Sequence, residues 1–345
     1  MKNLNQILDP KKIDLDGLKS KYAPLFKKIF PQRQSVEKTL ACDIGKSKIV
    51  FLELQKNPDH LFLTKLSFLK IPAQEKDVAP LLGNAFQLKQ FPREGIRTAL
   101  KGHGIIMRFI RFPKMKTDDL GSALKYEAEQ YIPFELNDMI LDYAVIEESV
   151  ATDDGEKMEL LLGAVKRQEI DPLIEMFKQL GCKLFCIDVA ILAALNSLEY
   201  FYPEAFNSHV GVLDLGTEIS TLGIVRSGKP RFIRDISYGT YDIQKRLKTR
   251  LNLSGEQLNE LFEQNKEFSP EQQIVLAESL ESLIGDIRVS LEYYREQLPS
   301  EKGLEKLFLT GGISLHPVIL KLLNEGLRLP VVSFDLTEKI RLAPE

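Results

Sequence analysis

One short arrangement of residues occurs twice in this chain and constrains the fold more than any other feature. A β-rich run ends in Asp-x-Gly, a polar bend follows, and a second β-rich run begins. The first copy spans residues 40–52 around Asp43, and the second spans residues 210–226 around Asp214. Runs of this length with glycine between them are typical of β-hairpins. A single Asp-x-Gly is ordinary turn chemistry, but two copies indicate two related halves that face each other.

Both bends have the chemistry of a phosphate site. The glycine two residues after each acid, Gly45 or Gly216, lets backbone amides approach an anion closely. Two such bends could hold a phosphate chain between them, and the carboxylates of Asp43 and Asp214 could hold a hydrated Mg²⁺. The sequence therefore predicts one cleft lined by both bends.

A third glycine motif, Thr310-Gly311-Gly312, follows a strand predicted over residues 304–309. A helix is predicted from about residue 315, with Pro317 in its first turn. Two glycines here let the backbone approach a nucleoside or its phosphate, beside the amides of a helix N-terminus. The alternative is a tight strand-to-helix turn.

Composition limits the classes of protein to consider. The 345 residues suffice for two domains, and their hydrophobic content of 44% is ordinary for a soluble globular protein. The net charge of −3 gives no reason to expect a nucleic-acid-binding surface. No apolar run approaches the length of a membrane-spanning helix, and no signal peptide is visible. Three cysteines and four scattered histidines favour reduced cysteines in a cytosolic protein over disulfides or a zinc site.

Residues 1–36 differ from the rest of the chain in charge. They carry eight Lys or Arg against three Asp, a net charge of +5, so the remaining residues carry −8. Apolar residues recur at helical spacing from Leu18 to Ile29 with lysines between them, and Pro24 must kink or divide that helix. This pattern is typical of a basic amphipathic segment that contacts an anionic membrane or a partner. The alternative is a helix packed on its own domain, or a frayed tail.

The region between the two hairpins predicts an α/β domain with an insertion. Residues 95–101 are interpreted as a connection into the insertion, and residues 104–186 read as a β-α-β-β-α block. Within that block Thr117 is expected to cap a helix, and a second helix is expected to end at Gly181 in a left-handed conformation. A connecting helix over residues 188–198 leads to the second hairpin.

The order hairpin, hairpin, Gly-Gly resembles the actin-like ATPase superfamily, whose members carry two phosphate motifs and then an adenosine motif. Within that superfamily, residues 39–340 resemble the PilM family of type IV pilus assembly proteins. The matching segments are Ile105-Ile106-Met107-Arg108, Phe112-Pro113-Lys114-Met115, Tyr126-Glu127-Ala128-Glu129-Gln130-Tyr131-Ile132-Pro133-Phe134, Leu141-Asp142-Tyr143 and Ile187-Asp188-Val189. The PilM family is related in plan to the cell-division protein FtsA, whose inserted subdomain lies in a different place from that of actin.

The resemblance implies an α/β fold: two actin-like domains built from duplicated ribonuclease-H-like units, with an inserted subdomain. The expected divisions are residues 1–36 for the basic extension, 37–103 with 187–205 and 330–345 for the first domain, 104–186 for the inserted subdomain, and 206–329 for the second domain.

The resemblance also implies that the cleft binds ATP and Mg²⁺. The nucleotide contacts that it implies are Asp43, Gly45, Lys46, Ser47, Asp214, Gly216, Thr217, Gly239, Gly311 and Gly312. Asp43 and Asp214 would hold the Mg²⁺ through water. No residue is assigned a catalytic role.

Some residues depart from the family pattern. Lys46 and Lys48 stand where the family has two small hydroxyl residues, and Lys46 could either pair with a phosphate or fill the place of the metal. Asn259 and Phe262 stand where the family has an acid and a lysine that face the nucleoside. We therefore expect that nucleotide binds weakly and is hydrolysed slowly or not at all.

The function implied by the resemblance is that of a cytoplasmic scaffold, peripheral at the inner membrane, in a type IV pilus or related secretion platform. In the family, the cleft beside the inserted subdomain receives the N-terminal tail of a PilN-like inner-membrane protein. An ATP-dependent phosphotransferase on the same fold is one alternative, but it needs a general base that the sequence does not single out beyond Asp43 and Asp214. An L-type component of type II secretion is another, and such a protein carries a transmembrane segment. The oligomeric state stays open.

Overall fold

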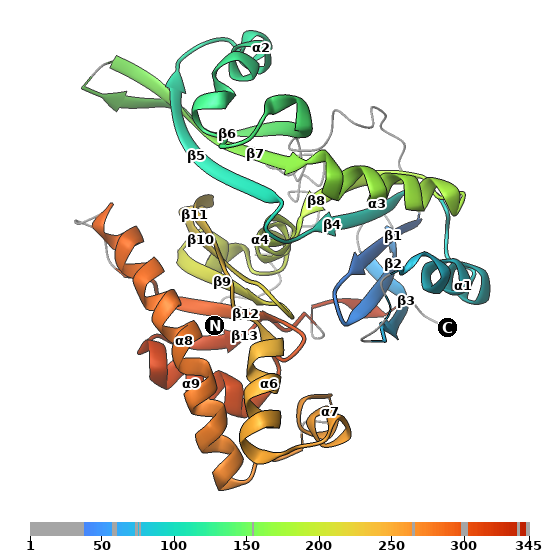
Figure 1. Cartoon of the computed structure of the whole chain (residues 1–345). Helices are drawn as coiled ribbons and strands as arrows, with labels where there is room; N and C mark the ends of the chain where they lie inside the picture. Colours follow the sequence, from blue (N-terminus) through green and yellow to red (C-terminus); the bar gives the residue numbers. More distant parts are fainter. Residues whose placement is uncertain are drawn as a thin grey trace, which may run out of the picture.

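The computed structural model describes residues 38–342 apart from 57–60, 73, 74, 76, 154, 264, 265, 298–302, 337 and 338. The basic extension expected over residues 1–36 lies outside the described residues. Three sheets organise the chain, with six, five and three strands among the residues described. Figure 1 shows them as two lobes with a third unit above.

The first lobe is built on the six-stranded sheet, whose order is β14-β3-β2-β1-β4-β8. Its strands are β1 (Lys38–Ile44), β2 (Lys48–Lys56), β3 (Leu61–Lys70), β4 (Ile96–Leu100), β8 (Leu184–Val189) and β14 (Arg341–Leu342). The first three form an antiparallel meander, and β4 and β8 add parallel strands beside β1. Two helices, α1 (Ala79–Lys89) and α3 (Arg167–Gln179), contribute to its core.

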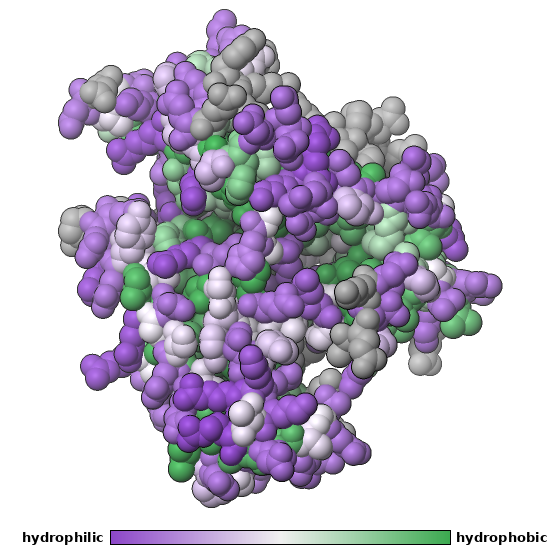
Figure 2. Space-filling view, in the orientation of Figure 1, coloured by the Kyte–Doolittle hydropathy of each residue, from purple (hydrophilic) through white to green (hydrophobic). Residues whose placement is uncertain are grey.

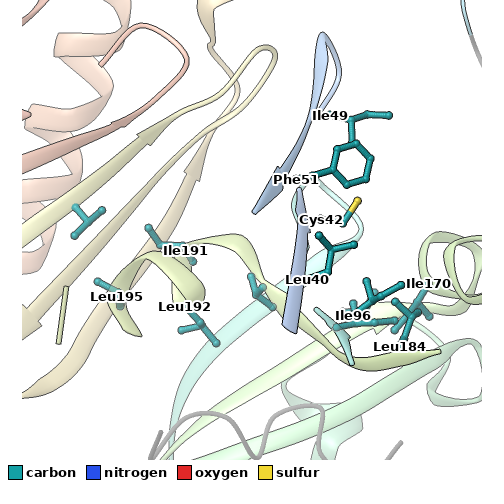
Figure 3. Close-up of a cluster of buried hydrophobic side chains, with 14 of the residues drawn as sticks. Leu40, Cys42, Ile49, Phe51, Ile96, Ile170, Leu184, Ile191, Leu192 and Leu195 are labelled. Atoms are coloured by element: carbon teal, nitrogen blue, oxygen red, sulfur yellow. The ribbon is translucent and has the colours of Figure 1, made fainter. Parts of the chain in front are cut away.

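Alternation along β1 and β2 determines which residues form that core. Leu40 and Cys42 on β1, and Ile49 and Phe51 on β2, are all buried, and Figure 3 shows them together on one side of the hairpin. Successive side chains of a strand point to opposite faces. Asp43 therefore points away from this core, toward the face of the sheet where a ligand could reach it.

The second lobe repeats the topology of the first. Its sheet has the order β11-β10-β9-β12-β13, which matches β3-β2-β1-β4-β8 of the first sheet strand for strand. The strands are β9 (His209–Leu215), β10 (Ser220–Arg226), β11 (Lys229–Ile236), β12 (Lys306–Gly311) and β13 (Val331–Ser333). The helices of this lobe are α6 (Thr240–Leu251), α7 (Gly255–Glu263), α8 (Pro270–Glu296) and α9 (Pro317–Leu327). The internal repeat predicted from the two Asp-x-Gly hairpins is thus present in the strand order of both lobes.

Local sequence signals explain where the longest helix begins. Pro270 occupies the first turn of α8, where its missing N–H is not needed. The Ser269 hydroxyl accepts a hydrogen bond from the Gln272 amide at 3.2 Å, and the Gln272 side chain accepts one from the Ser269 amide at 2.9 Å. This reciprocal pair is a capping box, which satisfies two amides that the helix itself leaves unpaired.

The inserted subdomain consists of β5 (Ile105–Pro113), α2 (Thr117–Glu127), β6 (Met139–Thr152) and β7 (Gly155–Lys166), with short 3₁₀ turns at Ala128–Gln130 and Leu136–Asp138. Its sheet has the order β5-β7-β6, and it has a core of its own around Phe112, Leu120 and Leu160. It leaves and rejoins the first lobe at one place, because Ile105 and Val165 are register partners on β5 and β7.

Two segments connect the lobes. Helix α4 (Ala190–Phe201) follows β8 and packs on the second sheet at Gly223, where a Cβ would lie 2.9 Å from a side-chain carbon of Ile191. The short helix α5 (Pro203–Phe206) then leads into β9. At the other end, β13 belongs to the second sheet, while β14 pairs with β3 of the first.

The structure differs from several expectations. Residues 96–100 form the strand β4 rather than a connection, and Asp188 lies in the strand β8, which ends at Val189, instead of beginning a helix. Thr117 is the first residue of α2, so the cap position belongs to Lys116. Gly181 does adopt the expected left-handed conformation, with φ +67°.

The sheet pairing also bears on the expected domain boundaries. Residues 167–186 were expected within the inserted subdomain, but Ile170 and Phe177 lie in the core of the first lobe, and β8 joins its sheet. Residues 330–345 were expected in the first domain, whereas β13 joins the second sheet and β14 the first. The strands β8, β13 and β14 have six, three and two residues, which is too few alternations to show which sheet each one joins.

Candidate functional site

The two Asp-x-Gly bends, one from each lobe, contact each other. The first bend joins β1 to β2, and the second joins β9 to β10. The Oγ of Ser47 lies 3.4 Å from the Oγ1 of Thr217, and the Nζ of Lys46 lies 3.5 Å from a carboxylate oxygen of Glu218. The bends therefore face each other, as the repeat predicts. A phosphate oxygen that accepts from both hydroxyls would replace their direct contact.

Three charged groups gather behind these bends. The ammonium of Lys101 lies 3.6 Å from Oδ1 of Asp43, whose side chain is half-exposed. Burial raises the pKa of the Asp214 carboxyl, and the nearby Lys101 ammonium lowers it in part while the Asp43 carboxylate raises it further. Asp43, Asp214 and Lys101 thus form one electrostatic cluster, with one residue from each of three strand ends.

Sequence analysis missed Lys101, because residues 95–101 were interpreted as a connection. Lys101 directly follows β4, and β4 runs parallel to β1 with Cys42 opposite Thr98. Parallel neighbouring strands end at the same edge of a sheet, so a residue that follows β4 lies beside the bend that follows β1. If residues 96–100 had been recognised as a strand parallel to β1, Lys101 would have been predicted to lie near Asp43.

Glycines hold the second bend by close backbone contacts. A Cβ at Gly311 would lie 2.2 Å from the carbonyl oxygen of Leu215, and one at Gly239 would lie 2.3 Å from that of Thr217. The amide of Thr240, which follows Gly239, donates a hydrogen bond to the carbonyl of Gly216 at 2.9 Å. These glycines pack two neighbouring segments against the bend, from β12 on one side and from the start of α6 on the other.

At the first bend, the Gly45 amide donates to the Lys48 carbonyl at 2.9 Å and so closes the turn within the hairpin. Lys48 extends toward the third glycine motif, with its Nζ 3.7 Å from the place where a Cβ of Gly312 would lie. Lys46 pairs with Glu218 rather than with either aspartate. The ammonium that lies beside Asp43 belongs to Lys101 and not to Lys46.

The residues expected near the nucleoside divide between surface and core. Asn259 is exposed, whereas Phe262 is buried in the core of the second lobe. The Phe262 ring packs edge-on against the Phe268 ring, with 5.5 Å between the ring centroids. The Phe268 ring in turn packs against the imidazole of His316, with 4.9 Å between the ring centroids. Burial lowers the pKa of His316, partly opposed by the backbone carbonyls of Lys266 and Leu261. Position 262 therefore offers packing and no charge.

A cavity of about 250 Å³ lies where the inserted subdomain meets both lobes. Its walls come from the end of β4, the start of β5, the junction of β8 with α4, and the strands β10 and β11. The lining residues include Lys101, Ile105, Ile106, Met107, Arg108, Ile191, Thr221, Ile233, Arg234 and Asp235. Figure 2 shows hydrophobic residues gathered in the hollow below the inserted subdomain. The cavity has an apolar wall with charged groups around it.

Two residues of the cavity wall, Lys101 and Thr221, lie beside the aspartates of the two bends. Lys101 lines the cavity and also pairs with Asp43. Thr221 is the register partner of Asp214, and its hydroxyl donates to Asp235 at 2.7 Å. A second acid, Asp188 at the end of β8, has a pKa raised to about 6 by burial, partly opposed by the hydrogen bond from the Val189 amide.

A cluster of ion pairs joins the inserted subdomain to the second lobe. Arg231 on β11 contacts Glu147 on β6 and Glu159 on β7, each at 2.6 Å, and Lys229 also pairs with Glu147. Burial alone would raise the pKa of Glu147, but the hydrogen bonds from Lys229 and Arg231 outweigh it and lower that pKa. We call these four residues the β11 ion cluster. No pattern in the sequence brings them together.

The duplicated strand order and the two facing bends define a protein of the actin-like ATPase fold. The chain is similar in fold to a solved structure of the ethanolamine utilization protein EutJ from Carboxydothermus hydrogenoformans. The two are 11% identical in sequence, with a TM-score of 0.53 over 92% of this chain and 93% of that chain. A chain of a solved PilM-PilN type IV pilus biogenesis complex is 25% identical, with a TM-score of 0.78 over 90% of this chain and 92% of that chain.

The profile of the type IV pilus assembly protein PilM matches residues 41–345. The chain belongs to this family, and the assignment made from the sequence is confirmed. No helix among the described residues has the length and apolar content needed to cross a membrane.

Proposed function

We propose that this chain is a scaffold of a type IV pilus inner-membrane platform, peripheral to the membrane, which holds the N-terminal tail of a PilN-like membrane protein. The observation that carries this proposal is the cavity beside the inserted subdomain. The solved relative is itself a PilM-PilN complex, which supports a partner of the same kind here.

The chemistry of the cavity suits a short extended peptide. Ile106 and Met107 on β5 and Ile233 on β11 supply apolar surface, while Arg108 and Asp235 supply charges for orientation. Moreover, β5 pairs only with β7 among the described strands, so it is an edge strand of its sheet. An edge strand can accept an added peptide strand through main-chain hydrogen bonds, with side-chain pockets providing specificity.

Binding of a synthetic tail peptide tests this assignment. We expect Met107→Glu to weaken binding by about tenfold or more, because the new carboxylate would be buried against an apolar ligand without a partner. Val289→Glu is the matched control, because Val289 is 54% exposed on α8. Circular dichroism of both variants checks the fold. Equal binding by Met107→Glu and the wild type would place the tail elsewhere.

We also propose that the cleft binds nucleotide weakly and turns it over slowly or not at all. The actin-like fold and the facing bends support a phosphate site, whereas Asn259 and Phe262 supply neither the acid nor the lysine of the family pattern. Each lost charged hydrogen bond is worth about 1.5–3 kcal/mol, so two would weaken affinity by about a hundredfold or more. Calorimetric titration with ATP, beside an Asp214→Ala control, measures this. Tight binding with steady phosphate release that the control abolishes would contradict it.

A further inference from the structure

The cleft contains a cation of its own. Lys101 places its ammonium 3.6 Å from the carboxylate of Asp43, and 34% of its side chain is exposed. Asp214 lies at the corresponding position of the facing hairpin, and its carboxyl interacts electrostatically with both Lys101 and Asp43. An ammonium that interacts with both carboxylates neutralises part of their charge, as a metal ion there would do.

A hydrated Mg²⁺ does not fit this arrangement. Mg²⁺ demands near-ideal octahedral coordination and retains several waters, so it needs room around the carboxylates that hold it. The Lys101 ammonium already occupies space beside Asp43, and it would repel a divalent cation at that place. The residues present therefore disagree with the metal that the fold class implies.

Lys48 supplies a second ammonium from the first lobe, and it reaches toward the second lobe. Its Nζ lies near Gly312, in the strand-to-helix turn that follows β12. Lys48 begins β2 and Lys101 follows β4, so both lysines are held by strands of the first sheet. A ligand with two linked phosphates could contact one ammonium at each end.

We infer that Lys101 takes the place of the metal ion in this cleft, and that the cleft holds a diphosphate group through Lys101 and Lys48 without a divalent cation. This inference rests on the proposed nucleotide site and specifies how that site binds. Lys101 acts on the phosphates directly, and the two aspartates serve to position its ammonium.

The first experiment uses Mg²⁺ alone and needs no nucleotide. We compare the melting temperature of the full chain with and without millimolar Mg²⁺, for the wild type and for Lys101→Met. The wild type is expected to show no change, while Lys101→Met gains a Mg²⁺-dependent rise because its two carboxylates have lost their counter-charge. Lys178→Met is the matched control, since Lys178 pairs with Glu175 on the surface of α3. A Mg²⁺ response in the wild type, or none in Lys101→Met, would overturn the assignment of Lys101.

The second experiment titrates inorganic pyrophosphate and ADP into the same proteins, with EDTA or with Mg²⁺. For the wild type we expect dissociation constants within about threefold in the two buffers, and for Lys101→Met in EDTA an increase of about tenfold. Stronger binding of ADP than of pyrophosphate identifies the nucleotide as the source of the diphosphate. A wild type that binds only with Mg²⁺ contradicts the inference. Absence of binding in every buffer refutes the proposed nucleotide site, while the Mg²⁺ experiment still decides the role of Lys101.

Discussion

Gly311 illustrates how a single residue can hold a functional loop in place. Its φ of +110° is strained for any residue with a side chain, and an added Cβ would lie 2.2 Å from the Leu215 carbonyl oxygen. That carbonyl belongs to the backbone at the end of β9, directly before the second bend, so it cannot move aside as a flexible side chain could. The glycine is therefore needed for packing whether or not a ligand binds.

We predict that Gly311→Ala lowers the free energy of unfolding by about 2–4 kcal/mol, because it combines a backbone clash with an unfavourable φ. Gly285→Ala is the matched control. Gly285 lies within α8, and a Cβ there would meet nothing within 4 Å. In that helix alanine should stabilise by about 0.5–1 kcal/mol. Urea unfolding measures both changes, and equal stability of the two variants would show that the bend tolerates a side chain at position 311.

At the scale of secondary-structure elements, the β11 ion cluster determines how the inserted subdomain sits on the second lobe. Arg231 is only 15% exposed and lies between two glutamates from neighbouring strands of the inserted subdomain. Two charges attract each other more strongly when they are partly removed from water than when they lie on the open surface. Deletion of one partner of such a pair therefore costs more stability, because the other charge is left partly buried and unpaired. The cluster therefore holds together two elements that the chain connects only through the first lobe.

Replacement of Arg231 by methionine should lower the free energy of unfolding by about 2 kcal/mol, because two partly buried carboxylates lose their shared partner. Arg246→Met is the control, since Arg246 pairs with Glu278 at the surface, and it should cost less than about 1 kcal/mol. Chemical denaturation compares the two, and increased protease cleavage at the β5–β7 sheet in Arg231→Met would accompany the loss. An Arg231→Met chain no less stable than Arg246→Met would mean that packing alone positions the inserted subdomain.

The elements that could be predicted from the sequence are those in which apolar residues recur at regular spacing or in which a glycine marks a turn. The hairpin around Asp43 and the left-handed Gly181 follow from alternation and from glycine chemistry. The strand β4 has five residues and β8 has six, and neither shows enough alternation to be distinguished from a connection or the start of a helix. Lys101 was missed together with β4. The partners of Arg231 come from β6 and β7, more than 70 positions away in the chain, and no single-sequence pattern encodes such a pairing.

At the scale of the whole molecule, charge is distributed unevenly along the chain. Residues 1–36 carry +5 and the remainder −8, although the net charge is only −3. A scaffold that gathers at a membrane benefits from one basic segment, because anionic lipids attract it while the acidic remainder stays in water. The contact between residues 1–36 and a membrane stays a proposal, since this segment lies outside the described residues.

Liposome flotation tests that proposal. The full chain should float with vesicles that contain anionic lipid, and the chain without residues 1–36 should not. A full-length variant with Lys19, Lys21, Lys27 and Lys28 changed to glutamine is the control for charge, and it should bind about as weakly as the truncated chain because each lysine contributes about 1 kcal/mol near an anionic surface. Equal flotation of the full and truncated chains would indicate that this segment does not mediate membrane contact.

The two ends of the inserted subdomain lie side by side where it joins the first lobe, and this determines how the subdomain could be removed or exchanged. Ile105 and Val165 lie opposite each other, and the Lys166 amide donates to the Gly104 carbonyl at 3.1 Å, so the sixty or so intervening residues begin and end side by side. Because this segment has its own hydrophobic core and its ends are adjacent, we expect that it can be removed or replaced as a unit. A two- or three-residue turn could close the gap left by its excision, and related chains could exchange this unit by a single genetic exchange.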